Sequence, residues 1–598
     1  MCGIIGCITI QNNIQKILIN NLKKLEYRGY DSSGLCIVNN NNFYVKKSLG
    51  QIKNLEDKID QTQSNIGIAH TRWATCGAVC LNNTHPLVGQ NKTWAVVHNG
   101  IIENYLKIKK QLTSINFCGD TDTEIIPNFL ELQKNTNNLK KIQNLTKNIV
   151  GSYAICLLNK DEPNTMYLVR KDSPLFVAKN SSTVLASSDP SCFAENFKTY
   201  YTLPQNTIAK LTLDSLEFFD FDLNKIDVKQ KKIGVFEKSS LLGKYKYFAE
   251  KEINQIPKVL QNISKAYYEQ DYFCKLDKTF LHDIFNIKLI GCGTSYHACF
   301  MGAKYLQSIC KIQSSAHIAS EFRYSNPIIN NHTLCVFVSQ SGETADTILC
   351  QELCKNMGAK TISVVNVPYS TLAQNSDVYL PLCAGMEIAV VSTKAYNAML
   401  YVLYLLANHI KCVLKDLPKD QTLLNQTLCY AKKSICFKNS KQIDELASLV
   451  LSHKKIFFIG KDQDYITALE AGLKLKEITY INCISIASGE LKHGTLSLVD
   501  NDSVVFVICT NQNLLSKNLA SADEIKSRGG KVVLVTNLNI KKTDTKNIDK
   551  IFKFAKCPNH LASNLAIIPF QMLAYKVCLS LGNNPDKPKN LAKSVTVE

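Results

Sequence analysis

The sequence predicts a multi-domain α/β protein in which a sheet-rich N-terminal part precedes two copies of a doubly wound α/β domain. Three observations support this prediction. The chain has 598 residues, too many for one hydrophobic core. Up to about residue 238, many short apolar runs and a few amphipathic helices alternate, as in sheets covered by outer helical layers. Beyond that point strands alternate with long helices, which indicates parallel sheets.

Composition excludes several classes of function. Hydrophobic residues make up 45% and charged residues 20%, as in soluble globular enzymes. The net charge of +19 is spread along the chain without a basic block interleaved with aromatics, which argues against nucleic-acid binding. The 23 cysteines lie mostly in apolar runs, with no signal peptide and no zinc-ligand spacing, so we expect a reduced, cytoplasmic protein without a metal site. The sequence has no uninterrupted run of about 18 apolar residues, so we expect no membrane span.

The chain opens with a candidate nucleophile. The small Cys2 after Met1 favours removal of Met1, which leaves a thiol and a free α-amine on one residue. The amine can take the thiol proton, and the thiolate can attack a carbonyl. The alternative is an ordinary core cysteine at the end of a buried strand.

The sequence pattern of the N-terminal part predicts sheets with few helices. Apolar residues at helical spacing predict a helix from Ile14 to about Tyr27, and a second helix is expected at 123–133. Strands are expected at 34–38, 43–46, 66–69, 94–98, 153–158, 166–169, 175–178, 184–186 and 208–213.

Four polar stretches interrupt these strands, at 27–32, 70–75, 98–104 and 119–124. Each alone could be a capped loop, and Asp122 could simply N-cap the following helix. Together they supply groups for amide hydrolysis. Arg72 can hold a carboxylate and Asp122 an ammonium, while the Asn99 amide and the Gly100 N–H can form an oxyanion hole. Carboxylate, ammonium and side-chain amide together describe glutamine.

These motifs resemble the N-terminal-nucleophile glutamine amidotransferases. The fuller match, through Arg-Trp-Ala-Thr and His-Asn-Gly-Ile-Ile-Glu-Asn, is similar to the isomerising glutamine–fructose-6-phosphate aminotransferases. The resemblance implies a four-layer αββα fold, with Cys2 as nucleophile, Arg72 and Asp122 as glutamine clamp, Asn99 and Gly100 as oxyanion hole, and Trp73 gating ammonia. Cys76 departs from the family, which usually has His there.

The second half repeats itself. Strands ending in Gly291 and Gly460 are each followed by a loop and a helix, and a second apolar strand follows each at matching spacing. Each copy resembles a sugar-isomerase (SIS) domain. The predicted boundaries are 2–221 for the amidotransferase domain, 222–276 for a linker and leading helix, 277–417 and 449–588 for the SIS copies joined by a polar helical stretch, and 589–598 for a catalytic tail.

A candidate phosphate loop runs from Ser339 to Thr344 in the first copy. It follows a buried strand, precedes a helix, and offers hydroxyl and backbone N–H donors. The alternative is a Ser/Thr helix cap. A second polar loop contains Thr294 and Ser295, whereas 509–511 in the second copy is poor in such groups, so we expect one site per chain. The resemblance assigns to the sugar phosphate Ser295, Ser339, Gln340, Ser341, Thr344 and Ser392.

Acid–base candidates come from the second copy and the tail. Lys474 and Glu477 share a helix face, where an exposed salt bridge is the alternative. The resemblance gives Glu477 the C1–C2 proton transfer, His493 ring opening, Lys474 a supporting charge, and Lys593 a Schiff base with the open ketose. Thr495 stands where most relatives have Pro after His-Gly.

The resulting prediction is transfer of the amide nitrogen of L-glutamine to D-fructose 6-phosphate, giving L-glutamate and D-glucosamine 6-phosphate. This is the first step of amino-sugar (UDP-N-acetylglucosamine) synthesis, with ammonia passing internally. The resemblance calls for no metal, nucleotide or pyridoxal phosphate, and implies a homodimer or higher oligomer. The alternatives are another amidotransferase, such as the phosphoribosyl-pyrophosphate type, and a non-catalytic sugar-phosphate sensor.

Overall fold

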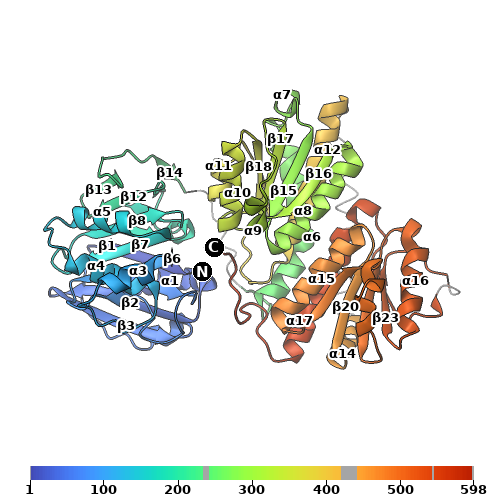
Figure 1. Ribbon diagram of the computed structural model, residues 1–598, viewed down its shortest axis with the longest axis horizontal. Coiled ribbons are helices and arrows are strands. Elements are labelled where there is room, and N and C mark those ends of the chain that lie inside the picture. Colours follow the sequence, from blue (N-terminus) through green and yellow to red (C-terminus); the bar gives the residue numbers. More distant parts are fainter. Residues whose placement is uncertain (1, 12, 234–241, 419–440, 542–544, 596–598) are drawn as a thin grey trace. The chain divides into compact units, whose positions relative to one another are not determined.

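The computed structural model describes residues 1–598 except 1, 12, 234–241, 419–440, 542–544 and 596–598 (Figure 1). Two units are distinguished by their internal contacts. The first comprises Met1–Glu237 together with Ala592–Glu598, and the second comprises Lys238–Leu591. Most of the polar stretch expected to join the two SIS copies lies outside the described residues.

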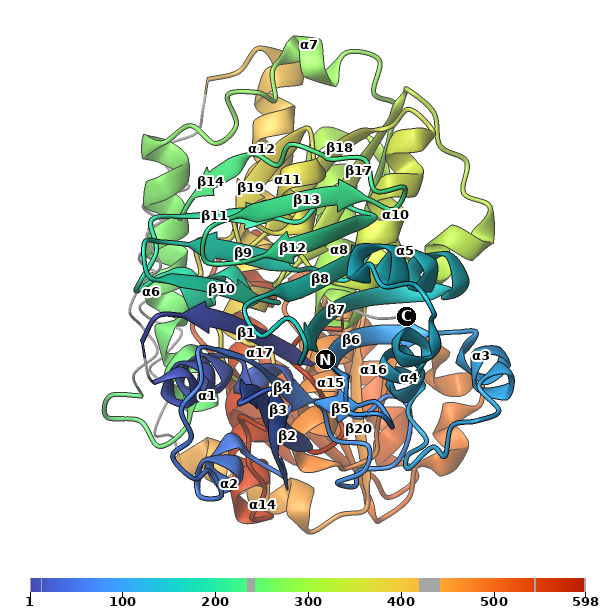
Figure 2. The same ribbon diagram turned by 90° about the vertical axis from the view of Figure 1, so that its left-hand side faces the viewer.

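The first unit is built on two antiparallel sheets (Figure 2). The eight-stranded sheet runs in the order β14 (Gln230–Lys232), β11 (Thr199–Thr202), β9 (Phe176–Lys179), β10 (Thr183–Ser187), β1 (Gly3–Thr9), β4 (Ile66–Arg72), β2 (Ser32–Asn39) and β3 (Asn42–Leu49). The six-stranded sheet runs β13 (Leu216–Asp220), β12 (Thr207–Leu211), β8 (Met166–Lys171), β7 (Gly151–Asn159), β6 (Trp94–Ile102) and β5 (Leu87–Val88).

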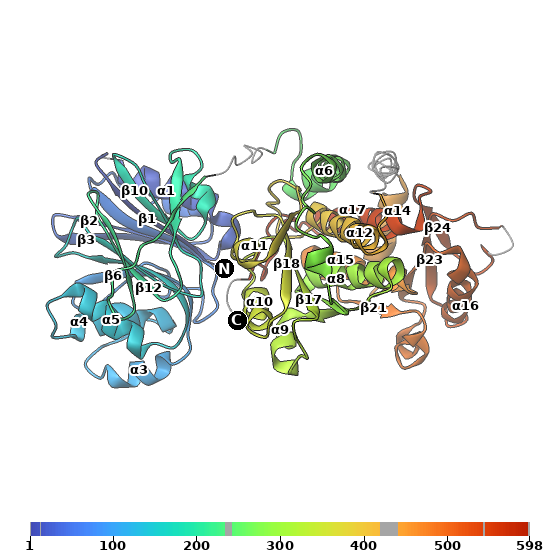
Figure 3. The same cartoon turned by 90° about the horizontal axis from the view of Figure 1, so that it is seen from above.

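Helices cover both sheets, which confirms the expected αββα layering. Figure 3 shows α1 (Ile14–Lys24) outside the larger sheet and α3 (Tyr105–Gln111), α4 (Ile125–Leu132) and α5 (Asn138–Asn148) outside the smaller one. One hydrophobic core fills the space between the sheets, and a second lies between the smaller sheet and its helices. The short helix α2 (Ile52–Glu56) follows β3.

All seven residues of β1 are buried, so the strand fixes the chain start in the core. Its glycines are required by close packing. A Cβ on Gly6 would lie 2.4 Å from the Met166 sulfur, and one on Gly3 would lie 2.8 Å from side-chain atoms of Leu25 and Thr71. The buried start of the chain therefore holds Cys2 at a defined place at the end of the strand.

The second unit contains two parallel five-stranded sheets with the same strand order. In the first copy the order is β16 (Gln313–Ile318), β15 (Asn286–Gly291), β17 (Thr333–Ser339), β18 (Lys360–Val365) and β19 (Val378–Pro381). In the second it is β21 (Cys483–Ala487), β20 (Lys455–Gly460), β22 (Ser503–Cys509), β23 (Lys531–Thr536) and β24 (Lys550–Lys553). The predicted duplication is confirmed, and both sheets have the doubly wound order 2-1-3-4-5.

Helices surround both sheets. They are α6 (Phe248–Glu269), α7 (Lys278–Leu281), α8 (Gly293–Tyr305), α9 (Ala319–Phe322), α10 (Ala345–Asn356), α11 (Thr371–Asn375), α12 (Lys394–Lys415), α14 (Lys441–Leu451), α15 (Gln463–Thr479), α16 (Leu515–Lys526) and α17 (Asn559–Ser580). One hydrophobic cluster includes residues of both copies, so they share a continuous core.

Two of these helices, α12 and α17, are long and apolar enough to cross a membrane by length and composition alone. However, 67% and 94% of their most apolar windows are buried inside the unit. Burial of this kind is what core helices of a soluble domain show, and their apolar surface is used in packing the two copies.

Candidate functional site

The Cys2 thiol lies against the backbone of Trp73. The Trp73 N–H donates to the Cys2 sulfur at 3.3 Å, and that sulfur lies 3.4 Å from the Trp73 carbonyl oxygen. Burial raises the pKa of the Cys2 thiol above its usual value, although nearby positive charge and the Trp73 N–H oppose the shift. The thiol is therefore protonated at neutral pH and needs a base to become a nucleophile.

Asn99, in β6, reaches the same residue. Its side-chain amide donates to the Cys2 carbonyl oxygen at 3.0 Å, and its Oδ1 lies 3.0 Å from Nε2 of His70. The same Nε2 lies 3.1 Å from the His98 carbonyl oxygen, so it faces two acceptors and must carry the proton. Burial lowers the pKa of His70 to about 3. His70 is thus a neutral donor that fixes which end of the Asn99 amide faces Cys2.

Gly100 follows with a backbone conformation that a side chain would not permit. Its φ is +130°, and a Cβ there would lie 2.0 Å from the Ser152 carbonyl oxygen on the neighbouring β7. Only glycine fits this position without moving β7. Gly100 therefore allows the close approach of β6 to β7 directly beside Asn99.

The two predicted clamp residues are both buried and take part in local networks. Arg72 donates to three carbonyl oxygens of the following loop, at 2.6 Å (Cys76), 3.2 Å (Gly77) and 3.2 Å (Ala78). Asp122 accepts from the Ile102 N–H at 2.7 Å, which ties it to β6. The cap of the following turn is Thr121, whose hydroxyl accepts from the Thr123 N–H, so the N-cap alternative for Asp122 is wrong.

Trp73 lies between these groups and a second aromatic ring. It is partly exposed and packs edge-on against Tyr30, with ring centroids 5.5 Å apart. The loop after it is held at Ala74, whose N–H donates to the Asp31 carboxylate at 2.9 Å. The stretches 70–75 and 98–104 thus contact Cys2 directly, and the stretches 27–32 and 119–124 contact those two in turn.

In the second unit, the loop 339–344 is shaped by its own hydroxyls. The Gly342 N–H donates to the Ser339 hydroxyl at 3.0 Å, and the Glu343 N–H donates to the Ser341 hydroxyl at 3.2 Å. Thr344 is the residue before α10, but its hydroxyl makes no cap hydrogen bond and instead lies 3.3 Å from that of Ser339. This arrangement does not support the helix-cap alternative. Gln340 accepts from the Asn366 N–H through its backbone oxygen at 3.2 Å.

A buried polar network joins the two SIS copies. Thr294, in α8 of the first copy, donates to Glu470 at 3.0 Å and accepts from Lys474 at 3.0 Å, both in α15 of the second copy. Lys474 also pairs with Glu470 at 3.3 Å and with Glu477 at 2.8 Å. The side chains of Lys474 and Glu470 are fully buried, and that of Glu477 is 21% exposed. The Lys474–Glu477 salt bridge is therefore present but is not an exposed surface pair.

The charge balance of this network follows from the pairing. Burial alone would raise the pKa of Glu470, but Lys474 and the His297 and Thr294 hydrogen bonds outweigh it and lower the pKa. Burial would lower the pKa of Lys474, but the two carboxylates raise it. Both groups are therefore charged at neutral pH. Sequence reasoning missed Glu470 and His297, which lie 2.7 Å apart.

We expect Glu470→Ala to lower the free energy of unfolding of the second unit by about 3–5 kcal/mol, because it leaves the buried Lys474 charge with one carboxylate fewer. The urea midpoint measures this. Glu445→Ala, which removes an exposed partner of Lys550, is the matched control and should cost about 1 kcal/mol or less. Equal midpoints for the two variants would contradict the assignment.

The other predicted residues lie in different environments. Ser295 is partly exposed in the first turn of α8, 3.7 Å from the Met399 sulfur. Ser392 donates to Glu387 at 3.0 Å. His493 is exposed in the loop after a short turn of helix, and Lys593 is partly exposed in the C-terminal segment that groups with the first unit.

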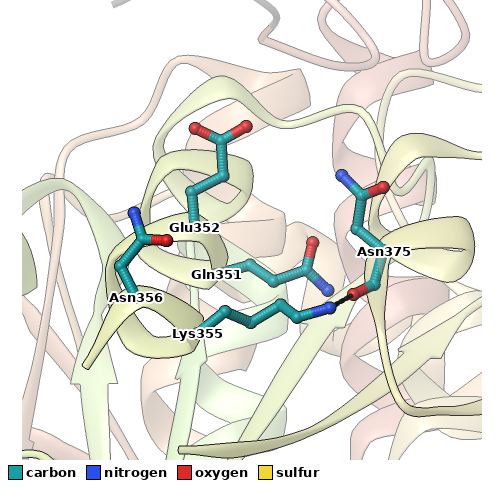
Figure 4. Close-up of a pocket in the computed structure, with 5 residues that line it drawn as sticks. All are labelled: Gln351, Glu352, Lys355, Asn356 and Asn375. Carbon is teal, nitrogen blue, oxygen red and sulfur yellow. Dashed lines mark hydrogen bonds between the residues drawn. The ribbon is translucent and has the colours of Figure 1, made fainter. Parts of the chain in front are cut away.

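One small pocket of about 280 Å³ is lined by Gln351, Glu352, Lys355, Asn356 and Asn375 (Figure 4). The Lys355 ammonium donates to the Asn375 carbonyl oxygen at 2.6 Å, joining α10 to α11. None of its lining residues is a predicted site residue. The candidate sites therefore rest on the convergence of side chains and not on this pocket.

Comparison with known families finds one domain type in the first unit and another, matched twice, in the second unit. A model of a glutamine amidotransferase domain matches residues 70–195, which include Arg72, Asn99 and Asp122. A SIS domain model matches twice, at 280–409 and 449–581.

Two relatives that align over their full length have the same name. The chain is 37% identical over 615 residues to a glutamine–fructose-6-phosphate aminotransferase [isomerizing] of Caldanaerobacter subterraneus subsp. tengcongensis, and 36% identical over 610 residues to that of Clostridium tetani. Each alignment covers 100% of both chains.

Among solved structures, the C-terminal domain of glucosamine-fructose-6-phosphate aminotransferase from Francisella tularensis is 30% identical, with a TM-score of 0.54. It covers 58% of this chain and is itself covered completely.

Proposed function

Because the chain belongs to the isomerizing glutamine–fructose-6-phosphate aminotransferases, we propose that it uses the Cys2 site to release ammonia from L-glutamine and the loop 339–344 to bind the phosphate of D-fructose 6-phosphate. The products are L-glutamate and D-glucosamine 6-phosphate. The observation that supports the proposal is the meeting of separate polar stretches at Cys2. Trp73 and Asn99 contact Cys2 directly, and Asp122 is bonded to Ile102 of the strand that carries Asn99.

In the glutamine half, the base is the α-amine of Cys2 after removal of Met1. An α-amine titrates near pH 8, so part of it is a neutral base at neutral pH. It takes the thiol proton, the thiolate adds to the amide carbon, and the oxyanion forms beside the Asn99 amide and the Gly100 N–H. Ammonia leaves, and water then hydrolyses the thioester to glutamate.

Arg72 and Asp122 hold the glutamine α-carboxylate and α-ammonium in this proposal. The guanidinium of Arg72 is planar and permanently charged, which suits a carboxylate. It donates to the carbonyls of Cys76, Gly77 and Ala78. We propose that the glutamine carboxylate replaces some of these carbonyl contacts of Arg72, while Trp73 gates the passage of ammonia.

In the sugar half, the hydroxyls of Ser339, Ser341 and Thr344 and the N-terminus of α10 supply donors for the phosphate. The other proposed contacts with the sugar phosphate come from Ser295, Ser392, Gln340 and Thr294. Glu477 moves the proton between C1 and C2, Lys474 supplies a fixed positive charge, His493 opens the ring, and Lys593 forms the Schiff base.

We expect Ser341→Ala and Thr344→Ala each to weaken fructose 6-phosphate binding by about 10- to 150-fold, because each removes a hydroxyl donor to a charged group worth about 1.5–3 kcal/mol. Calorimetry measures the dissociation constant. Ser448→Ala, which removes an exposed hydroxyl of α14, is the control. Unchanged affinity in both loop variants would show that this loop does not hold the phosphate.

The domain boundaries 2–221, 222–276, 277–417, 449–588 and 589–598 remain part of this proposal. The strand β14 lies beyond residue 221 and pairs with β11, while α6 falls inside the proposed linker. We also propose a homodimer or higher homo-oligomer in the cytoplasm. Every cysteine among the described residues is free, which supports a reducing compartment. Sedimentation and cell fractionation test these two points.

A further inference from the structure

The two SIS copies have the same sheet but different chemistry at the same place. In a sheet of order 2-1-3-4-5, ligands bind outside the carboxyl ends of the strands, where the order reverses. That point lies between β15 and β17 in the first copy and between β20 and β22 in the second. We call these points the first and second crevice. The first is bounded by residues 292–295 and 340–344, and the second by residues 461–464 and 510–511.

Ser295 and Asp464 are matching positions in the two crevices. Each lies four residues after the glycine that ends the first strand of its copy, in the first turn of the following helix. Each also packs over that glycine. A Cβ on Gly291 would lie 3.1 Å from Ser295 atoms, and one on Gly460 would lie 2.4 Å from Asp464. Sequence spacing and packing therefore give the same correspondence.

The Asp464 carboxylate lies at the second crevice and is bonded to its donors. It is fully buried, and it accepts from the Thr510 N–H at 2.9 Å and from the Thr510 hydroxyl at 2.6 Å. Thr510 is the first residue after β22, the place that Gln340 takes after β17. A backbone N–H and a hydroxyl are the donors that the first crevice offers to a phosphate. In the second crevice they are already bonded to an anion of the chain itself.

The pKa of Asp464 sets the conditions under which this anion exists. Burial raises its pKa to about 7, and the two hydrogen bonds from Thr510 oppose the shift. At pH 8 the side chain is therefore mainly a carboxylate, and experiments on it belong at that pH.

We propose that Asp464 is a built-in anion that closes the second crevice, and that the Ser found at the matching position in the first copy would reopen it to a phosphate-sized anion. With its crevice closed, the second copy binds no phosphate ligand there. Its helix α15 then serves the first copy instead, through the contacts of Glu470 and Lys474 with Thr294. The inference rests on the proposed sugar-phosphate role of the first crevice.

The test uses the full chain at pH 8. Calorimetry with fructose 6-phosphate counts sites in solution, and crystals soaked in tungstate, a phosphate-sized anion, locate them by anomalous scattering. In the wild type we expect one site per chain and tungstate in the first crevice only. In Asp464→Ser we expect tungstate in both crevices. Asp464→Asn, which keeps the volume and can still bond Thr510, should leave the second crevice empty.

Two results would overturn the inference. One is tungstate in the second crevice of the wild type, a test that does not depend on any variant folding. The other is an empty second crevice in Asp464→Ser crystals, which themselves show that the variant is folded. An empty first crevice in every crystal would instead count against the proposed function, so the two failures are distinguishable.

Discussion

Cys2→Ala is expected to reduce glutamine hydrolysis to below about one thousandth of the wild-type rate, because the carbon–sulfur bond of the thioester cannot form without the thiol. Sugar binding should not change, since the loop 339–344 belongs to another unit. Release of glutamate from glutamine measures the first effect, and calorimetry with fructose 6-phosphate measures the second.

The matched control is Cys118→Ala, which removes an exposed thiol of the same unit and should leave hydrolysis unchanged. Intact mass should show that Met1 is absent from active wild-type protein, because the α-amine of Cys2 must be free to act as base. Near-normal glutamate release by Cys2→Ala, or full activity with Met1 retained, would show that the nucleophile or its base is wrongly assigned.

Lys593→Arg is expected to reduce glucosamine 6-phosphate synthesis by at least about two orders of magnitude. A Schiff base needs a primary amine that can lose its proton, and the guanidinium of Arg stays protonated. Charge and side-chain length are nearly kept, so loss of activity reports the chemistry. Basal glutamine hydrolysis should survive, because Cys2 and its clamp are untouched.

Borohydride added with fructose 6-phosphate should attach the sugar to the peptide that contains Lys593. Lys589→Arg is the control, because Lys589 is close to Lys593 in the sequence but its ammonium lies over the Tyr480 ring, 4.5 Å from the ring centroid. Synthesis at the wild-type rate by Lys593→Arg would contradict the Schiff-base role of Lys593. Trapping of the sugar on Lys474 or Lys476 would contradict it as well, and the C-terminal tail would then only close the site.

The sequence was sufficient to predict the fold class because the hydrophobic pattern is strong where burial is complete. All seven residues of β1 are buried, and β17 and β22 are continuous buried runs. The edge strands were missed for the opposite reason. Residues of β13 and β14 are partly exposed, so their pattern is weak. The first helix ends at Lys24, and a separate 3₁₀ turn, Glu26–Arg28, completes the predicted length.

The sequence did not reveal Glu470, because its role depends on burial. Glu470 and Lys474 have the spacing of an ordinary surface pair. Only the packing of α15 against α8 shows that both are buried and bonded to Thr294. The orientation of Asn99 by His70 likewise depends on a contact between β4 and β6, which the local sequence does not encode.

In the proposed reaction, one chain couples glutamine hydrolysis at Cys2 to amination of a sugar phosphate. The most direct test incubates the protein with L-glutamine and D-fructose 6-phosphate and assays L-glutamate and D-glucosamine 6-phosphate separately. We expect equal amounts of the two products from the wild type and neither from Cys2→Ala. Glutamate without glucosamine 6-phosphate from the wild type, or the amino sugar from Cys2→Ala with glutamine as the nitrogen source, would contradict the proposed coupling.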